Sequence, residues 1–182
     1  RSSLTLAGCG SGAHPAGYKQ FQADAVSLAE RIRKEGMQRF SETYGHGPTR
    51  IQFQNKDPRG FAEFKTWLAE HSAVGSANTQ EGIQKERPSL YTLVDELKRI
   101  TVPTLIITGD EDWPCLQPGL MMKQTIPSAA LAVMPNTGHA VNIEEPDEYN
   151  RILGQFLNQV DSGRWPSRDP RAISASITGI NT

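Results

Sequence analysis

Two apolar runs of strand length, separated by one stretch of helical pattern, constrain the fold of this chain more than any other feature. The first run covers residues 102–108 and ends in the polar turn 109–112, and the second covers residues 129–134. Between them, residues 115–126 carry apolar side chains at helical spacing. A strand, a crossover helix and a second strand predict two parallel, neighbouring strands joined by a right-handed connection.

An acid and a histidine follow these two strands. Asp112 ends the turn after the first strand, and His139 follows the second strand, 27 residues further along the chain. The carboxyl ends of parallel strands share one edge of a sheet, and chemistry gathers there. We therefore expect the Asp112 carboxylate to contact the His139 ring, which would orient the imidazole for general base catalysis. The alternative is an ordinary turn aspartate and loop histidine.

The composition is that of an ordinary globular domain. The 182 residues are 37% hydrophobic and 21% charged, with a formal net charge of −1. This balance gives no indication of nucleic acid or an anionic membrane surface as a partner. No apolar run is long enough to span a bilayer, and no signal segment opens the chain. We expect a soluble, cytoplasmic protein.

Neither the cysteines nor the remaining histidines have the spacing of a metal site. Cys9 and Cys115 are the two cysteines, and they form neither a metal-spaced nor a redox pair. His14, His46 and His71 are scattered along the chain. We expect two reduced thiols and no bound metal.

The pattern divides the chain into four segments. Residues 1–17 are predicted to form an opening strand and a Gly-rich turn, and residues 18–100 a mostly helical lid. Residues 101–160 form the α/β core, and residues 161–182 an extended tail.

Within the lid, two stretches with Gly or Pro and few apolar residues, 45–60 and 75–80, are predicted to be loops. The last helix of the core is the clearest in the chain, because its apolar residues form one broad stripe: Tyr149, Ile152, Leu153, Phe156, Leu157 and Val160. Pro146 suits its first turn, and Glu144, Glu145 and Asp147 favour its positive end.

Several of these segments together resemble the C-terminal half of an α/β-hydrolase. The resemblance rests on residues 102–112, on Pro127, on Thr137-Gly138-His139 and on Glu144-Glu145-Pro146. The opening residues 1–7 resemble the sixth strand of that fold. The implied fold class is α/β: a partial α/β-hydrolase fold with a three-stranded parallel sheet, flanking helices and a helical lid insertion.

The resemblance also implies roles for single residues. Asp112 corresponds to the acid of a catalytic triad and His139 to its base, while Asp110 supports the turn. The serine nucleophile of the family sits in a Gly-x-Ser-x-Gly elbow on an earlier strand, which would precede Arg1. The chain, which lacks an initiating Met, would then be a fragment of a serine hydrolase that acts on a small ester-like substrate without a cofactor, and it would be inactive alone.

Other interpretations stay open. Ser11, in Cys9-Gly10-Ser11-Gly12, loosely resembles a nucleophile elbow, although no oxyanion loop precedes it and a His-Pro pair interrupts the helix that should follow at once. Trp113 and Cys115 follow the acid closely and are candidates for lining a substrate pocket, or for packing.

The family also includes carbon–carbon hydrolases, lactonases, dehalogenases and haloperoxidases, and fold alone does not choose among these activities. A different class of function is a non-catalytic module. The exposed opening strand, or the lid, would then mediate self-association into a homodimer.

Overall fold

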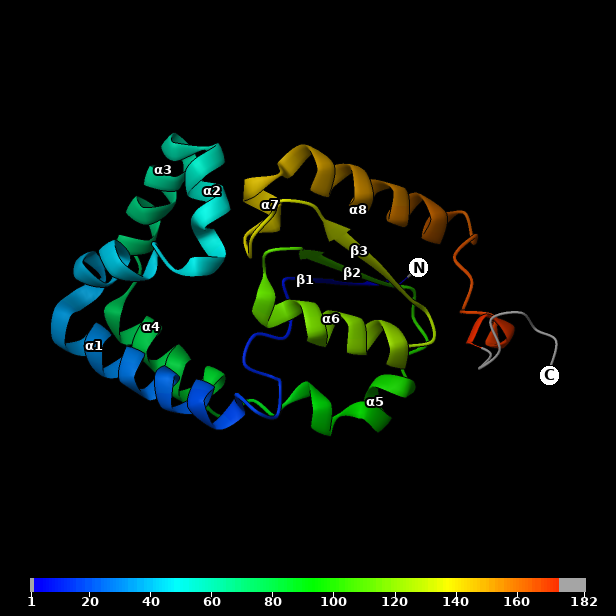
Figure 1. The fold of residues 1–182 in the computed structure, drawn as a ribbon, viewed down its shortest axis with the longest axis horizontal. Coiled ribbons are helices and arrows are strands. Elements are labelled where there is room, and N and C mark those ends of the chain that lie inside the picture. The colour runs from blue at the N-terminus through cyan, green and yellow to red at the C-terminus, as the bar shows by residue number, and fades with distance from the viewer. Residues whose placement is uncertain (1, 174–182) are drawn as a thin grey trace.

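A parallel sheet of three strands, in the order β1-β2-β3, forms the centre of the computed structural model, which describes residues 2–173. The strands are β1 (Leu4–Ala7), β2 (Thr104–Gly109) and β3 (Ala129–Met134). Each neighbouring pair runs parallel, so all carboxyl ends lie at the edge that faces the lid (Figure 1). The predicted fold class is confirmed.

The central strand β2 is buried along its whole length because helices cover both faces of the sheet. Leu105 and Ile107 pack in a cluster with Phe156 of α8 (Pro146–Asp161). Ile106 points to the opposite face, where it packs with Met122 of α6 (Trp113–Thr125). Figure 1 shows α8 and α6 on opposite sides of the strands. Burial on both faces explains why the sequence of β2 is a continuous apolar run.

The segment between β1 and β2 is mostly helical, as predicted. Its α-helices are α1 (Tyr18–Tyr44), α2 (Ile51–Lys56), α3 (Pro58–Ala69), α4 (Ala73–Thr79) and α5 (Val94–Lys98). We call α1 to α4 the lid helices, and Figure 1 shows them beside the carboxyl end of the sheet. Their shared core includes Ile32 and Phe40 of α1 and Ala77 of α4. Gly36, with φ +77°, lets α1 kink between its two halves.

The prediction of a loop over residues 45–60 was wrong. A 3-10 turn (Pro48–Arg50) leads into α2, and Pro58 is the first residue of α3. Both prolines therefore begin helical segments, where a missing N–H costs nothing, and do not interrupt them. Asp57 caps α3 by accepting a hydrogen bond from the Gly60 N–H at 2.8 Å.

The prediction of a loop over residues 75–80 was also wrong. These residues belong to α4 and to the single π-helical turn Gln80–Gln84 that continues it. Ser72 caps α4, since its hydroxyl accepts a hydrogen bond from the Gly75 N–H at 3.2 Å. Ala77 is fully buried against α1, so tertiary packing outweighs the weak helical propensity of this stretch.

The core ends with α7 (Val141–Glu144), which was not predicted, and with α8, which the apolar stripe predicted. Beyond α8, the Trp165 ring packs edge-on against Phe156, and its indole N–H donates to the Ser128 carbonyl at 2.8 Å. Residues 164–169 have no regular structure, and a 3-10 turn follows (Pro170–Ile173). The part of the tail prediction that concerns residues 174–182 lies outside the described residues.

Within residues 2–173, none of the helices combines the length and the apolar character that crossing a bilayer requires.

Candidate functional site

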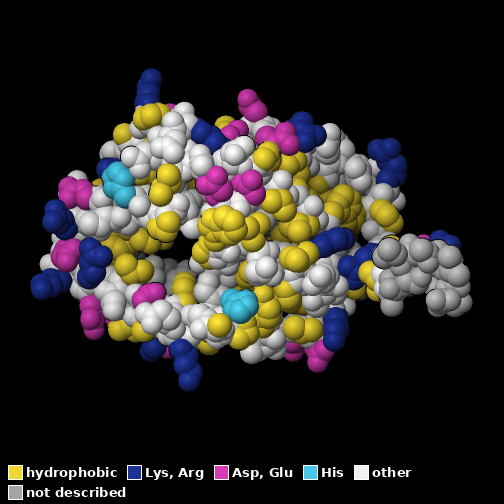
Figure 2. All heavy atoms as spheres, viewed as in Figure 1, with side chains coloured by type: hydrophobic (Ala, Val, Ile, Leu, Met, Phe, Trp, Pro, Cys, Tyr) yellow, Lys and Arg dark blue, Asp and Glu magenta, His cyan; other side chains and the backbone are white. Residues whose placement is uncertain are grey.

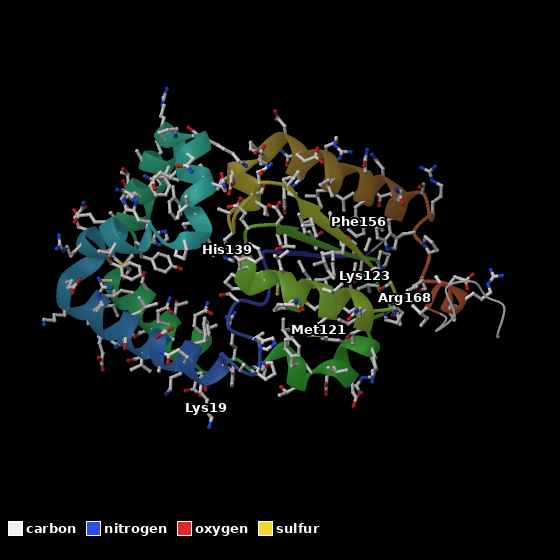
Figure 3. The ribbon with its side chains drawn as sticks, in the orientation of Figure 1. Lys19, Met121, Lys123, His139, Phe156 and Arg168 are labelled. Carbon is white, nitrogen blue, oxygen red and sulfur yellow. The ribbon has the colours of Figure 1, made fainter. Side chains whose placement is uncertain are left out.

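The two predicted residues meet at the carboxyl edge of the sheet. The Nδ1 atom of His139 lies 2.8 Å from the Oδ2 atom of Asp112. Asp112 is at the N-terminus of α6, and His139 lies in the loop between β3 and α7. Figure 3 shows His139 at the end of the sheet that faces the lid helices. The predicted contact between the carboxylate and the ring is confirmed as geometry.

Hydrogen bonds between the acid loop (109–112) and the histidine loop (135–139) hold the pair together. The Glu111 N–H donates to the Thr137 carbonyl at 3.0 Å. In return, the Thr137 N–H donates to Oδ1 of Asp110 at 3.1 Å, so Asp110 supports the turn as expected. The loops approach so closely that a Cβ on Gly109 would lie 2.0 Å from the Thr137 carbonyl oxygen, which only glycine avoids.

The two side chains lie in different environments, as suits an acid that orients a ring and a base that accepts a proton. The side chain of Asp112 is 1% exposed, whereas that of His139 is 34% exposed. A carboxylate accepts a hydrogen bond from the protonated Nδ1, which leaves Nε2 as the proton acceptor of the neutral ring. The arrangement can therefore take up a proton at Nε2 and stabilise the resulting cation from the buried side.

The structure places Cys115 and Trp113 around the pair but not in the lining of the cavity beside it. Cys115 is buried, with its Sγ 3.9 Å from Nδ1 of His139 and donating to the Gly8 carbonyl at 3.4 Å. Burial, followed by the negative charge of Asp112, raises the pKa of the Cys115 thiol far above its usual value. Trp113 is 74% exposed. Cys115 therefore packs beneath the His139 ring, and Trp113 lies at the surface. Neither position favours contact with a substrate.

Asp112, Cys115 and His139 also place potential metal-ligand atoms within 4.8 Å of one another. Cysteine binds metals as the thiolate, and the raised pKa of Cys115 opposes that form. Nδ1 of His139 is already engaged by Asp112. The chemistry of these donors therefore fits a proton-transfer pair better than a metal site.

The lid contacts both loops of the pair. The His139 N–H donates to the Thr49 carbonyl at 2.8 Å, which joins the histidine to the turn before α2. From α2, the Gln52 amide donates to both carboxylate oxygens of Glu111, at 2.8 and 2.9 Å. One short segment of the lid thus holds both the acid loop and the histidine loop.

An ion pair between a buried carboxylate and a partly exposed lysine strengthens this contact. Glu144 has a fully buried side chain, and its Oε2 accepts a hydrogen bond from the Gly138 N–H at 2.9 Å. Its Oε1 lies 3.1 Å from Nζ of Lys56 in α2, and Lys56 also lies 2.6 Å from Glu145. Burial would lower the pKa of Lys56, but its bonds to Glu145 and Glu144 outweigh burial and raise it.

We call the Lys56–Glu144–Gly138 contact the lid clamp. Sequence reasoning missed it because Thr49, Gln52 and Lys56 fell in a predicted loop. The Asp57-Pro58 pair, a cap followed by a first-turn proline, was the signal that could have marked helical structure there.

A cavity of about 690 Å³ lies between the lid and the carboxyl edge of the sheet, and both Asp112 and His139 line it. Its other walls come from the turn after β1, from α1, from the turn 47–50 and from the segment around the π-helical turn. Figure 2 shows a hollow between the lid helices and the sheet, with hydrophobic side chains on both sides. Its size is that of a site for a small molecule.

Ser11 lines the same cavity but is not arranged as a nucleophile. Among the described residues, no hydrogen bond joins its hydroxyl to His139, and its carbonyl accepts a hydrogen bond from Arg87. Ser11 lies in a turn, and α1 begins only at Tyr18. It therefore lacks the strand-turn-helix setting of a nucleophile elbow.

Comparison with known proteins agrees with the fold. The model of the alpha/beta hydrolase family matches residues 4–152. The chain belongs to the α/β-hydrolase family. The matched residues include β1, the lid, both loops of the Asp112–His139 pair and the first part of α8.

Two curated relatives have different activities. A putative 2-succinyl-6-hydroxy-2,4-cyclohexadiene-1-carboxylate synthase of Bacillus subtilis is 25% identical over 134 residues, which cover 73% of this chain and 48% of the relative. A 2-hydroxymuconate semialdehyde hydrolase of Pseudomonas putida is 27% identical over 128 residues, which cover 69% of this chain and 44% of the relative. The chain thus spans about half the length of these relatives.

Two solved structures have the same fold. MenH from S. aureus matches with a TM-score of 0.80 at 22% identity, over 88% of this chain and 60% of that protein. A thermophilic esterase from Thermogutta terrifontis matches with a TM-score of 0.69 at 24% identity, over 87% of this chain and 56% of the esterase.

Proposed function

We propose that this chain supplies the acid, the base and the lid of a serine-type α/β-hydrolase that cleaves small carboxylic esters or related acyl compounds. The observation that carries the proposal is the 2.8 Å contact between Nδ1 of His139 and the buried Asp112, at the wall of a cavity of ligand size. Membership of the α/β-hydrolase family supports a hydrolytic reaction. The serine nucleophile, in this proposal, lies outside the 182 residues.

The reaction proceeds in two halves. The serine hydroxyl attacks the substrate carbonyl while Nε2 of His139 takes its proton, and the alcohol then leaves with that proton. Water attacks the acyl-serine in the same way and releases the acid. Asp112 holds the ring through Nδ1 and stabilises the imidazolium in both halves. The lid excludes solvent from the cavity.

Two substitutions in the full-length protein test the roles of the pair. Replacing His139 with Ala, or Asp112 with Asn, should lower kcat for p-nitrophenyl butyrate by roughly 10³-fold or more, because each change removes the proton acceptor or its orientation. The matched control is His71→Ala, an exposed histidine that does not line the cavity. Turnover by His139→Ala at the wild-type rate would refute the assignment.

A fluorophosphonate reagent tests where the nucleophile lies. The full-length protein should become labelled at a serine outside these 182 residues, and the 182-residue chain alone should stay unlabelled. Labelling of Ser11 in the isolated chain, located by peptide mass spectrometry, would instead make Ser11 the nucleophile and overturn this part of the proposal.

A further inference from the structure

The arginines that line the cavity differ from most other arginines of the protein. Seven described arginines lie within 4.0 Å of a carboxylate at the surface: Arg31, Arg33, Arg39, Arg59, Arg99, Arg151 and Arg171. Arg50 and Arg87 line the cavity. Among residues 2–173, neither of these two forms an ion pair with a carboxylate. Neither charge is therefore paired with a carboxylate of the described residues in the cavity.

Arg50 approaches the cavity beside the histidine loop. Arg50 is the last residue of the 3-10 turn Pro48–Arg50. Thr49, in the same turn, accepts the hydrogen bond from the His139 N–H. The guanidinium carbon lies 4.5 Å from the centre of the Tyr44 ring, and one N–H group donates to the Tyr44 hydroxyl at 3.2 Å. Stacking fixes the plane of a guanidinium and leaves most of its five N–H donors free for a ligand.

Arg87 approaches the cavity from the side of the turn after β1. Its guanidinium carbon lies 4.7 Å from the centre of the Phe21 ring, and it donates to the Ser11 carbonyl. Phe21 and Ser11 both line the cavity. An aromatic ring and a hydrogen bond to a neutral oxygen, the Tyr44 hydroxyl for Arg50 and the Ser11 carbonyl for Arg87, thus hold each arginine in place without neutralising its charge.

The acidic side chains of the lining do not offset both arginines. Asp112 is buried beneath His139 and is engaged by its ring. Asp24 is exposed, and its Oδ1 accepts a hydrogen bond from Gln20 at 2.8 Å. The surface of the cavity therefore presents two guanidinium groups and one carboxylate, next to the apolar side chains of Phe21 and Leu28.

We propose that Arg50 and Arg87 form a subsite for a substrate carboxylate, so that the preferred substrates are esters or acyl compounds that also carry a free carboxylate group. This inference rests on the proposed function and adds the substrate class. Carboxylate is favoured because a guanidinium fork binds its two oxygens in one plane, and because a low-dielectric cavity strengthens such a bond. The apolar wall accommodates the chain that links the carboxylate to the scissile carbonyl.

Binding to the 182-residue chain tests the subsite independently of turnover. Succinate should bind, as followed by calorimetry and by chemical-shift changes of residues around the cavity, and neutral succinamide should not. Arg50→Gln and Arg87→Gln should each weaken succinate binding by about tenfold or more, because each removes one charge-assisted contact. Arg33→Gln, which removes an exposed arginine paired with Glu81, is the control and should bind as the wild type does.

Three outcomes would overturn the subsite. These are no binding of succinate by the wild-type chain, equal binding of succinate and succinamide, or tighter binding of inorganic phosphate than of succinate. Circular dichroism checks the folding of each variant. If Arg50→Gln fails to fold, Arg50→Lys keeps the charge without the fork and should bind succinate at intermediate strength, and Arg87→Gln supplies the independent test.

Turnover by the full-length protein separates this inference from the proposed function. The ratio of kcat/KM for p-nitrophenyl hemisuccinate over p-nitrophenyl butyrate should fall at least tenfold in Arg50→Gln and Arg87→Gln, and should stay unchanged in Arg33→Gln. An unchanged ratio in the first two variants would refute the subsite. If neither ester is hydrolysed while succinate binding still depends on both arginines, the proposed function fails and the carboxylate subsite stands.

Discussion

At the scale of single residues, the glycine before the proposed base has no room for a side chain. A Cβ on Gly138 would lie 2.1 Å from the Thr49 carbonyl oxygen and 3.2 Å from Oε2 of Glu144. The Thr49 carbonyl already accepts the His139 N–H, so it cannot move away without breaking that bond. Glycine at position 138 therefore allows the close contact between the lid and the histidine loop.

Gly138→Ala in the 182-residue chain should lower the free energy of unfolding by about 1–3 kcal/mol, because the extra methyl group forces the two backbones apart. Urea denaturation measures this change. The matched control is Gly154→Ala in α8, where a Cβ would have nothing within 4 Å. That variant should be more stable by roughly 0.5–1 kcal/mol, since alanine favours a helix interior. Equal effects of both substitutions would contradict this account.

The sequence predicts some residues of the candidate site far better than others. Asp112 and His139 could be found because each follows an apolar strand, and parallel strands bring their carboxyl ends to one edge. Arg50, Arg87 and Lys56 carry no such periodic signal. Their roles depend on which surface of the lid faces the sheet, and that is set by packing between segments distant in the sequence.

At the scale of elements, α2 and the histidine loop behave as one unit. The lid clamp joins them through the buried carboxylate of Glu144, which bonds Gly138 with one oxygen and faces Lys56 with the other. A buried charge that loses its partner pays a desolvation cost that an exposed one does not. The clamp therefore connects the position of the lid to the position of His139.

Lys56→Met should destabilise the 182-residue chain by about 1–3 kcal/mol, because it leaves Glu144 buried without a cation. The double variant Lys56→Met with Glu144→Gln should lose less stability than the sum of the two single variants, since the unpaired charge is then absent. Urea denaturation of all four proteins closes this double-mutant cycle.

Lys98→Met is the control for the clamp. It removes a lysine from an ion pair with Asp95 in which the Lys98 side chain is 60% exposed and the Asp95 side chain 81%. The substitution should leave the denaturation midpoint unchanged, because exposed ion pairs contribute little to stability. Strictly additive effects of the Lys56 and Glu144 substitutions would show that the two side chains do not interact, and the clamp would be rejected.

Most elements could be predicted from apolar periodicity, and the failures have a common cause. Long apolar patterns allowed the prediction of β2, β3, α6 and α8. Each pattern arises because the element buries one or both of its faces in the core. Residues 45–60 and 75–80 are rich in Gly, Pro or small polar residues, yet Phe53 and Ala77 are buried in them. Short helices of this kind are stabilised by capping and by tertiary contacts, which no local pattern contains.

At the scale of the whole molecule, β1 is an edge strand of the sheet, and the described residues leave backbone groups on its outer side unpaired. β1 pairs with β2 on one side, where the N–H groups of Leu4 and Gly8 donate to the Pro103 and Ile107 carbonyls at 2.9 Å. Alternation along a parallel strand directs the N–H groups of Thr5 and Ala7 to the other side. Side chains along β1 are only partly buried. Such an edge favours pairing with another strand.

We therefore expect the 182-residue chain, prepared alone, to self-associate into a homodimer through β1 as its concentration rises. Thr5→Pro should shift the chain to a monomer, because proline removes one N–H group from the free edge. The substitution leaves the hydrogen bonds between β1 and β2 intact. Thr5→Val keeps that N–H group and should dimerise as the wild type does. Light scattering after size exclusion measures the mass of each protein, and circular dichroism checks its folding. A wild-type chain that stays monomeric at every concentration, or a folded Thr5→Pro variant that still dimerises, would exclude β1 as the interface.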